Sequence, residues 1–388
     1  MAEADGERPA GWLQPLTERR ASWVELFVDL VFVVSVAQLS HALVDEPTAT
    51  GFLEFGASFV PVWWAWVGFT FYADRFEADD AVYRLLMLAG MLAVAALAVN
   101  VPYAFEDGSR AFALSYVAVR AALVLLYARA RRRAPAARPL IHLYMTAFTV
   151  SIAVWVASVF VPAPARYALW AGALAVDLGV PLALGPRVIP RAPIHASHIP
   201  ERFGLFTLIV FGETILAVVV GTAETHWELR SVVVAGAGFV AVSALWWLYF
   251  DYLDASILER SVRAGQLYVY GHLPLLAGLT AVGAGTALAI GEAGQPALAA
   301  GARWALCGGV AVSILAMAAI HLGSVRSLRD RDVWLRAAAA GAALALAAVE
   351  TAALVAVPAC AALLVALVAL EVVGHGGRAG ARAVGERD

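Results

Sequence analysis

The sequence lacks lysine, has only two cysteines and carries few charges for its length. Of its 388 residues, 15% are charged and 62% are hydrophobic, and the mean hydropathy is +0.77. A water-solvated surface of this size needs more charged groups than that, so the composition excludes a soluble protein. We predict an integral membrane protein whose solvent and main partner is the lipid bilayer.

The scarcity of cysteine and of positive charge excludes further classes. Cys307 and Cys360 each lie in an apolar run, where a small buried thiol is ordinary, so we predict neither a disulfide framework nor a cysteine metal site. The arginines form short separate clusters, and the formal net charge is −3. A phosphate-binding surface needs a positive field, so we predict no nucleic-acid partner. We also predict no bound metal and no cofactor.

Long apolar runs are what the sequence has in abundance. A membrane-spanning helix needs about 20 mostly apolar residues. The last two candidates are divided by Pro358 alone, but 337–374 is too long for a single helix across a core about 30 Å thick. We predict an all-α bundle of about twelve transmembrane helices, at 23–43, 52–73, 81–103, 110–130, 140–161, 166–185, 203–223, 231–251, 264–290, 300–322, 333–354 and 356–373.

The arginines orient these helices. Cytoplasmic loops of membrane proteins carry an excess of arginine and lysine. Placing both termini in the cytoplasm puts Arg120 within a span and assigns all but four of the other arginines to the cytoplasmic side. The four that fall outside are Arg110, Arg166, Arg230 and Arg303.

The second half of the chain repeats motifs of the first. Residues 26–32, Leu-Phe-Val-Asp-Leu-Val-Phe, resemble residues 205–211, Leu-Phe-Thr-Leu-Ile-Val-Phe, and the next span of each half carries a Trp-Trp pair at 63–64 and 246–247. We predict two tandem repeats of parallel orientation, with a transport site between them. The predicted segments are an N-terminal cytoplasmic tail, a first six-helix repeat, a cytoplasmic linker, a second repeat and a C-terminal tail, at 1–22, 23–185, 186–202, 203–373 and 374–388.

Few ionisable residues fall inside the predicted spans. A charge in the bilayer costs at least a few kcal/mol, so such residues usually face inward, are paired and are functional. Glu25 and Asp29 share one face of the first helix, and Arg120, Asp177 and Glu213 lie midway along the fourth, sixth and seventh. We predict these five residues to form a binding site or ion pathway, in which Asp29, Asp177 or Glu213 neutralises Arg120. The alternative, an acidic first helical turn in the headgroup zone, suits Glu25 better than Asp29, which lies further along the helix.

A second group of candidates lies near the start of the second repeat and in the Trp-Trp pairs. His195, His198 and Glu201 have a spacing compatible with two metal ligands on one face, although a solvated, pH-sensitive loop is the preferred interpretation. His272 and Glu350 are further polar groups within predicted spans. The secondary site candidates are His198, Glu201, Arg202, Trp64 and Trp247. Tryptophan also gathers at membrane interfaces by default.

Three motifs together resemble a known family. They are Trp23-Val-Glu-Leu-Phe-Val-Asp-Leu-Val-Phe32, the Trp63-Trp64 span that ends in Tyr72-Ala-Asp-Arg-Phe76, and Glu201-Arg-Phe-Gly-Leu-Phe206 with Gly212-Glu213. This combination resembles the bacterial low temperature requirement protein A (LtrA) family over residues 20–370. The resemblance implies a multi-pass protein of the bacterial inner (plasma) membrane, linked by name to growth in the cold.

A weaker similarity connects residues 20–32 with potassium channels of six plus six helices, whose repeats open with an Arg…Phe-Ser-Asp signature. Val28 stands in place of the serine, and residues 206–208 of the second half have no aspartate. No pore residue is therefore carried over.

The predicted parallel repeats and intramembrane charges favour a proton- or cation-coupled transporter, ahead of a channel, acting on a small solute or ion. One alternative is a sensory or structural membrane protein that supports growth at low temperature. Another is a membrane-embedded enzyme acting on lipid, but no nucleophile–base set is found, so we predict no catalytic residue.

Overall fold

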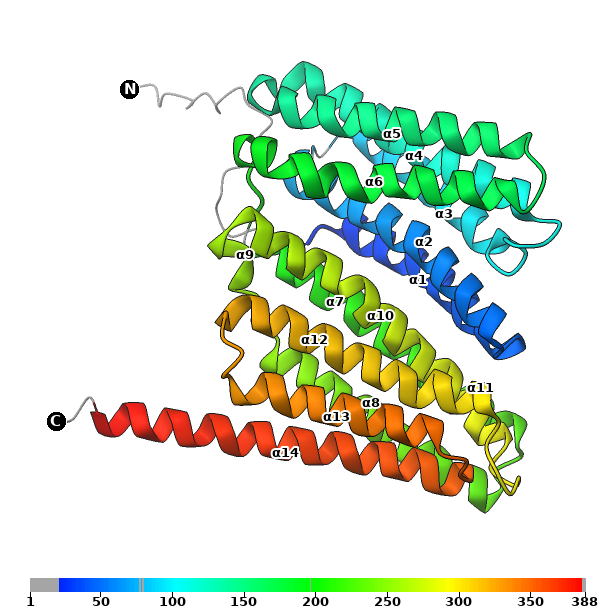
Figure 1. Ribbon diagram of the computed structural model, residues 1–388. Helices are drawn as coiled ribbons and strands as arrows, with labels where there is room; N and C mark the ends of the chain where they lie inside the picture. Colours follow the sequence, from blue (N-terminus) through cyan, green and yellow to red (C-terminus); the bar gives the residue numbers. More distant parts are fainter. Residues whose placement is uncertain (1–20, 77, 79, 196, 386–388) are drawn as a thin grey trace, which may run out of the picture. The chain divides into compact units, whose positions relative to one another are not determined.

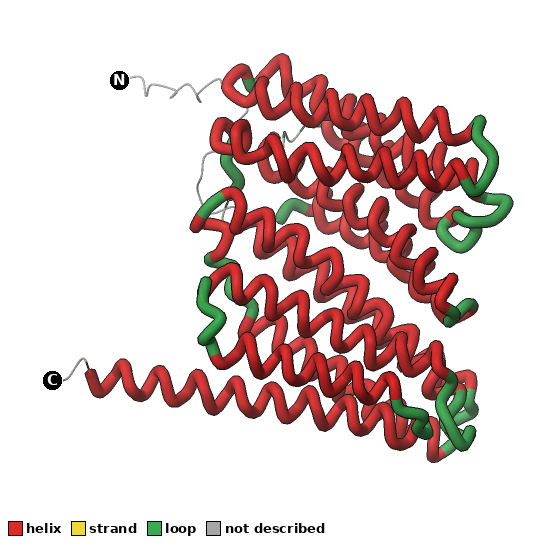
Figure 2. The backbone as a smooth tube through the Cα atoms, in the orientation of Figure 1, coloured by secondary structure: helices red, strands yellow, loops and turns green. Residues whose placement is uncertain are grey.

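The computed structural model describes residues 21–76, 78, 80–195 and 197–385, with side chains up to Gly374. Within these ranges the chain forms helices joined by loops, and no strand occurs (Figure 2). The predicted all-α bundle is therefore confirmed. Most of the predicted N-terminal tail, including Arg20, and the side chains of nearly all of the C-terminal tail lie outside the described residues.

The described helices follow the predicted spans closely (Figure 1). Three short segments lie between or beside the long ones: η1 (Pro135–Ala137), η2 (Ile189–Arg191) and α9 (Ile257–Arg260). One long helix is built from α11 (Ala300–Arg303), the π-helical turn η3 (Trp304–Gly308) and α12 (Gly309–Val325). The others are α1 (Trp23–Asp45), α2 (Ala49–Phe76), α3 (Ala81–Asn100), α4 (Ser109–Arg133), α5 (Arg138–Val159), α6 (Ala165–Val188), α7 (His198–Glu224), α8 (Leu229–Tyr252), α10 (Val262–Gly291), α13 (Arg331–Ala348) and α14 (Ala353–Gly385).

Eleven helices of the described residues are long and apolar enough to cross a membrane. The remaining long helix is α13, which has 18 residues. Its first six residues include Arg331, Asp332 and Arg336, so its apolar part is short for a bilayer core. Helix α13 is thus the one predicted span that length and composition do not support by themselves.

The predicted division at Pro358 is wrong. Helix α13 ends at Ala348, and α14 begins at Ala353, so the break lies before the proline. Pro358 is inside α14, in its second turn, where it removes one backbone hydrogen bond without ending the helix. Glu350, predicted within a span, is exposed in the connection.

The chain divides into two compact units, each described here by itself. Unit 1 comprises residues 1–32 and 63–202, and unit 2 comprises residues 33–62 and 203–388. The last boundary, at 202/203, coincides with the start of the second predicted repeat. Residues 33–62, however, belong with the C-terminal unit. The repeat is a relation in the sequence and stays a prediction.

Unit 1 is packed through aromatic side chains. Helix α4 contacts α3 and α5, and α5 contacts α6. The rings of Trp155 and Trp170 stack with centroids 4.9 Å apart, and Tyr127 meets Tyr72 edge-on at 5.1 Å. Such pairs add to the burial of apolar area that holds the unit together.

Unit 2 is packed through small residues. Helix α10 lies along α12, α12 along α13, and α8 along α14 (Figure 1). Gly271, Gly278 and Gly285 recur every seven residues on the face of α10 that meets α12 and η3. A Cβ atom on Gly278 would lie 2.7 Å from the carbonyl oxygen of Gly309, so this glycine permits a close helix contact.

Candidate functional site

A buried polar cluster lies at one end of unit 1, where α1 and α7 begin and α2 ends. Glu25 is the third residue of α1, Asp74 lies two residues before the end of α2, and His198 opens α7. We call this group the α1–α2–α7 cluster. All its members are buried, and they are Glu25, Asp29, Trp66, Asp74, His195, His198 and Arg202.

The local sequence explains why Glu25 lies there. The backbone N–H of Ser22 donates to Glu25 Oε2 at 2.8 Å, and the Glu25 N–H donates to Ser22 Oγ at 3.4 Å. This is the reciprocal capping box that an S-x-x-E sequence forms at a helix start. Glu25 therefore acts as a first-turn acid through Oε2, while its other oxygen, Oε1, faces the cluster.

The start of α7 separates the residues whose spacing is compatible with metal ligands. His198 and Arg202 are four residues apart, share one face and are both buried. Glu201 is rotated away from that face and is exposed. The structure therefore does not bring Glu201 together with His195 and His198. The preferred interpretation of a solvated loop is wrong for the two histidines, because both are buried.

His198 bridges two carboxylates that come from different helices. Its Nδ1 lies 2.9 Å from Asp74 Oδ1, and its Nε2 lies 3.4 Å from Glu25 Oε1. The Nδ1 of His195 lies 3.3 Å from the same Asp74 oxygen, and the His195 backbone N–H donates to Asp74 Oδ2 at 3.2 Å. An imidazole donates from both nitrogens only when it is protonated, so the contacts of His198 depend on one proton.

Asp29 lies about 9 Å further along α1 than Trp23 and receives two donors. Trp66 Nε1 donates to Asp29 Oδ1 at 2.8 Å, and Arg202 Nη2 donates to the same oxygen at 2.6 Å. Asp29 Oδ2 is buried and has no hydrogen-bond partner among the described residues. Asp29 is therefore neutralised by Arg202 and not by Arg120.

The cluster holds more acids than permanent cations. Asp29 pairs with Arg202 and Asp74 lies near Arg75, which also donates to the Ala192 carbonyl at 2.8 Å. Within the described residues the group thus joins three carboxylates, two guanidinium groups and two imidazoles that can each take up a proton. Buried charges persist only when they are paired in this way.

A second buried ion pair lies midway along α4 and α6 of unit 1. Arg120 Nη2 is 3.0 Å from Asp177 Oδ2, and that oxygen also accepts from Tyr116 and Ser151 at 3.0 Å each. Of the three acids considered as partners of Arg120, the structure selects Asp177. The guanidinium also lies 4.8 Å from the ring centroid of Phe148.

Glu213 and the second Trp-Trp pair lie in unit 2, apart from these groups. Glu213 is partly exposed on α7, its electrostatic neighbour is His41 of α1, and it makes no ion pair within the described residues. Trp247 is 44% exposed, as suits a lipid-facing side chain, whereas Trp64 is buried.

The sequence analysis missed a bidentate ion pair of unit 2. Arg336 Nε and Nη2 donate to the two carboxylate oxygens of Glu371 at 2.8 Å each, and both side chains are buried. Arg336 was assigned to a cytoplasmic loop. Glu371 is the single charged residue of 353–374, which is the signal that could have identified it. His272, predicted as a network member, is hydrogen-bonded to the Tyr249 hydroxyl at 3.0 Å.

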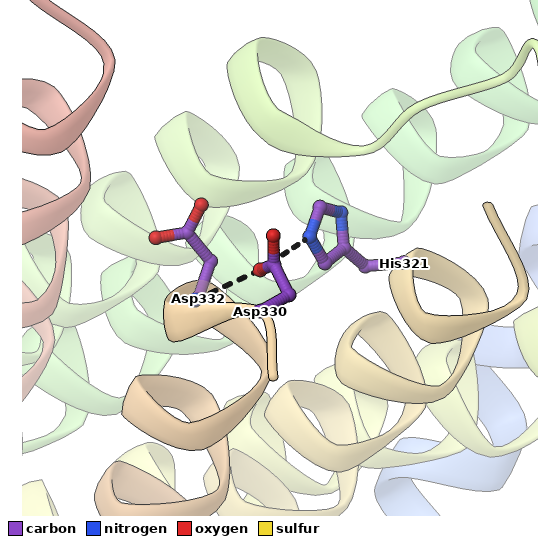
Figure 3. A group of neighbouring side chains, drawn as sticks. All are labelled: His321, Asp330 and Asp332. Atoms are coloured by element: carbon purple, nitrogen blue, oxygen red, sulfur yellow. Dashed lines mark hydrogen bonds and ion pairs between the residues drawn. The ribbon is translucent and has the colours of Figure 1, made fainter. Parts of the chain in front are cut away.

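One group of the described residues could hold a metal ion: His321, Asp330 and Asp332, whose ligand atoms lie within 4.8 Å of one another (Figure 3). Asp330 also caps α13, because it accepts from the Asp332 N–H at 3.0 Å and faces His321 Nε2 at 3.2 Å. Burial opposes the charge of Asp330, but these hydrogen bonds outweigh it and hold its pKa below the usual range. The group is thus explained as a helix cap.

Comparison with known proteins identifies the family. Residues 20–370 match the family described as bacterial low temperature requirement A protein (LtrA). The chain is also 30% identical over 308 residues to "Uncharacterized protein RA0937" of Rhizobium meliloti (strain 1021), a match that covers 73% of this chain and 74% of that protein. The chain therefore belongs to the bacterial low temperature requirement A protein family and is a multi-pass membrane protein with many apolar helices.

Proposed function

We propose that this protein is a proton-coupled transporter of the bacterial plasma membrane, with both termini in the cytoplasm, and that the α1–α2–α7 cluster binds the coupling proton. The observation that carries the proposal is the buried imidazole of His198 between the carboxylates of Glu25 and Asp74. The transported partner is a small solute or ion.

Protonation of His198 would change how three helices are held together. As an imidazolium it donates from Nδ1 to Asp74 and pairs electrostatically with Glu25 through Nε2, and so links α7 to α2 and to α1. As a neutral ring it keeps one donor, and one of the two links is lost. A proton can therefore bias two packing arrangements of these helices, which is what coupling requires.

The position of the cluster supports this role. It lies at the helix ends of unit 1 where arginines gather, such as Arg75, Arg202 and the run at 131–133, and we assign these ends to the cytoplasmic side. Asp29 lies deeper, and the Arg120–Asp177 pair is midway along its helices. The proposed proton route runs inward from His198 by way of Asp29 towards Asp177.

The parallel six-helix repeats remain part of the proposal. We include α13 as a twelfth membrane-spanning helix, because an even number of spans keeps both termini and the arginine-rich loops on one side of the membrane. Glu213 stays a predicted pathway residue, and Glu213→Gln is tested in the assay described next.

The test is proton flux into liposomes that hold the purified protein, followed with an enclosed pH-sensitive dye after a pH step. We expect His198→Gln to lower the flux on the order of 100-fold, the usual effect of losing a proton-transfer group. Glu201→Gln is the matched control, because it changes an exposed residue one turn away on the same helix.

Three results would contradict the proposal. Equal flux in His198→Gln and wild type would place the proton elsewhere, and potassium flux without proton movement would indicate a channel. Absence of any flux from folded protein would favour the sensory or structural role in growth at low temperature.

A further inference from the structure

The two cysteines of the chain meet inside unit 2. Cys307 lies in the π-helical turn η3 and Cys360 lies in α14, and their sulfur atoms are 3.2 Å apart. Both residues have no exposed surface. The sequence analysis treated them as separate buried thiols, because 52 residues stand between them and nothing in either apolar run points to the other.

The two sulfurs lie at the same depth along neighbouring helices. Cys307 is seven residues beyond Ala300, where α11 begins, and Cys360 is seven residues beyond Ala353, where α14 begins. Each is therefore about 10 Å along its helix from the same end of unit 2. The Leu298 N–H donates to the Thr351 carbonyl at 2.8 Å, which ties the two helix starts together.

The π-helical turn also has close contacts with α10 and, through Arg303, with α13. A Cβ atom on Gly285 of α10 would lie 2.2 Å from the backbone nitrogen of Leu306, so α10 presses directly against η3. Arg303 Nε also donates to the Ala347 carbonyl at 3.2 Å, next to the end of α13. A π turn redirects the side chains that it carries, and such turns are frequent at functional sites. Here the turn presents Cys307 to Cys360.

We propose that Cys307 and Cys360 form a reversible disulfide that joins η3 to α14. A disulfide has its sulfurs about 2.05 Å apart, so they need to approach by about 1 Å. Each thiol loses one proton and one electron as the S–S bond forms. The two electrons and two protons pass to a lipid-soluble quinone, which becomes the quinol.

A quinone is the fitting oxidant because of where the thiols lie. Neither sulfur is exposed, and both sit well inside an apolar helix bundle, where a charged or water-soluble oxidant is strongly disfavoured. The proposal concerns unit 2 and does not depend on proton transport through the α1–α2–α7 cluster.

The chain makes the test direct, because it contains only two cysteines. Purified full-length protein is incubated with a fully ring-substituted benzoquinone, which cannot add a thiol to its ring, and is then denatured and treated with a thiol-reactive polyethylene glycol maleimide. We expect no reactive thiol in the monomer and two after reduction with a phosphine. The intact mass should fall by the mass of two hydrogen atoms.

The controls are Cys307→Ala and Cys360→Ala, each of which should keep one reactive thiol before and after the quinone. Trypsin adds a second readout, because exposed Arg326 and Arg329 lie between the two cysteines. Cleavage there leaves fragments that should separate only on reduction. Two reactive thiols in quinone-treated wild type, or thiol loss through a covalent dimer, would overturn the proposal.

Discussion

The helices of the two units are held together by different kinds of contact. Unit 1 buries more charged groups than unit 2. They are Glu25, Asp29, Asp74, Arg75, Arg120, Arg166, Asp177 and Arg202 in unit 1, against Asp332, Arg336 and Glu371 in unit 2. Unit 2 relies on glycine contacts along α10. Polar links can respond to a proton, whereas close backbone packing cannot, so the proposed coupling belongs to unit 1.

Positions matched by the predicted repeat show the same contrast. Aligning 26–32 with 205–211 sets Asp29 opposite Leu208, which is 47% exposed while Asp29 is fully buried. Trp63 and Trp64 are buried in unit 1, but Trp246 and Trp247 are exposed in unit 2. Positions that match in sequence therefore differ in burial between the two units.

The largest expected loss of stability comes from breaking a buried ion pair of unit 1. Asp177→Leu leaves Arg120 charged and buried without its carboxylate, so we expect the free energy of unfolding to fall by about 3–5 kcal/mol. Adding Arg120→Met should recover most of that loss, because no uncompensated charge remains. Denaturant unfolding in detergent measures both. A double variant as unstable as the single one would show that the pair is not the cause.

The next effect breaks the close packing of unit 2. Gly285→Ala places a methyl group against the Leu306 backbone, and we expect a loss of about 1–3 kcal/mol from overpacking. Gly341→Ala is the control, since nothing lies within 4 Å of its added methyl. That variant should be neutral or more stable by up to about 1 kcal/mol. Equal thermal stability of the two variants would contradict the role given to the α10 glycines.

A matched pair of hydrogen bonds sharpens the comparison. Trp66→Phe removes the donor to the charged Asp29, and we expect a loss of about 2 kcal/mol. Tyr249→Phe, at the matched position of unit 2, removes a bond to His272 and should cost about 1 kcal/mol. Unfolding of both in one detergent measures the difference. A larger loss in the tyrosine variant would reverse the proposed contrast.

The smallest effect depends on pH and tests the cap of α13. The lowered pKa of Asp330 means that its charge stabilises the fold above the unfolded value of about 3.9. This contribution is lost as pH falls through the lower folded pKa. Asp330→Asn should therefore cost about 1 kcal/mol at pH 7 and nearly nothing at the acid end. If Asp330→Asn lowered the free energy of unfolding by the same amount at pH 3 and at pH 7, the ionised carboxylate would not be the source of the stabilisation.

The helices could be predicted from the sequence because the runs of apolar residues are long and their breaks are charged. The cost of a charge in the bilayer also indicated that Asp29, Arg120 and Asp177 would lie inside, and all three are buried. The helix break after Ala348 was missed although Glu350 and Thr351 lie in it, because Glu350 was assigned to the interior of a span and Pro358 drew the boundary instead.

The partners of the buried groups could not be predicted in the same way. Asp74, His198 and Glu25 come from distant parts of the sequence. Asp29 and Arg202, in the same cluster, are 173 positions apart. Trp66 was one of three nearby tryptophans, and only the rotation of α2 decides which one reaches Asp29. The pairing of Cys307 with Cys360 depends equally on tertiary packing.

The most direct test of the central claim compares the buried histidines of the two units. Proton flux into liposomes is measured for His198→Gln and His272→Gln, each first shown to be folded by size-exclusion chromatography. We expect flux to be lost in His198→Gln and kept in His272→Gln, because only His198 bridges two carboxylates. Flux kept in His198→Gln and lost in His272→Gln would contradict the assignment of the coupling proton to unit 1.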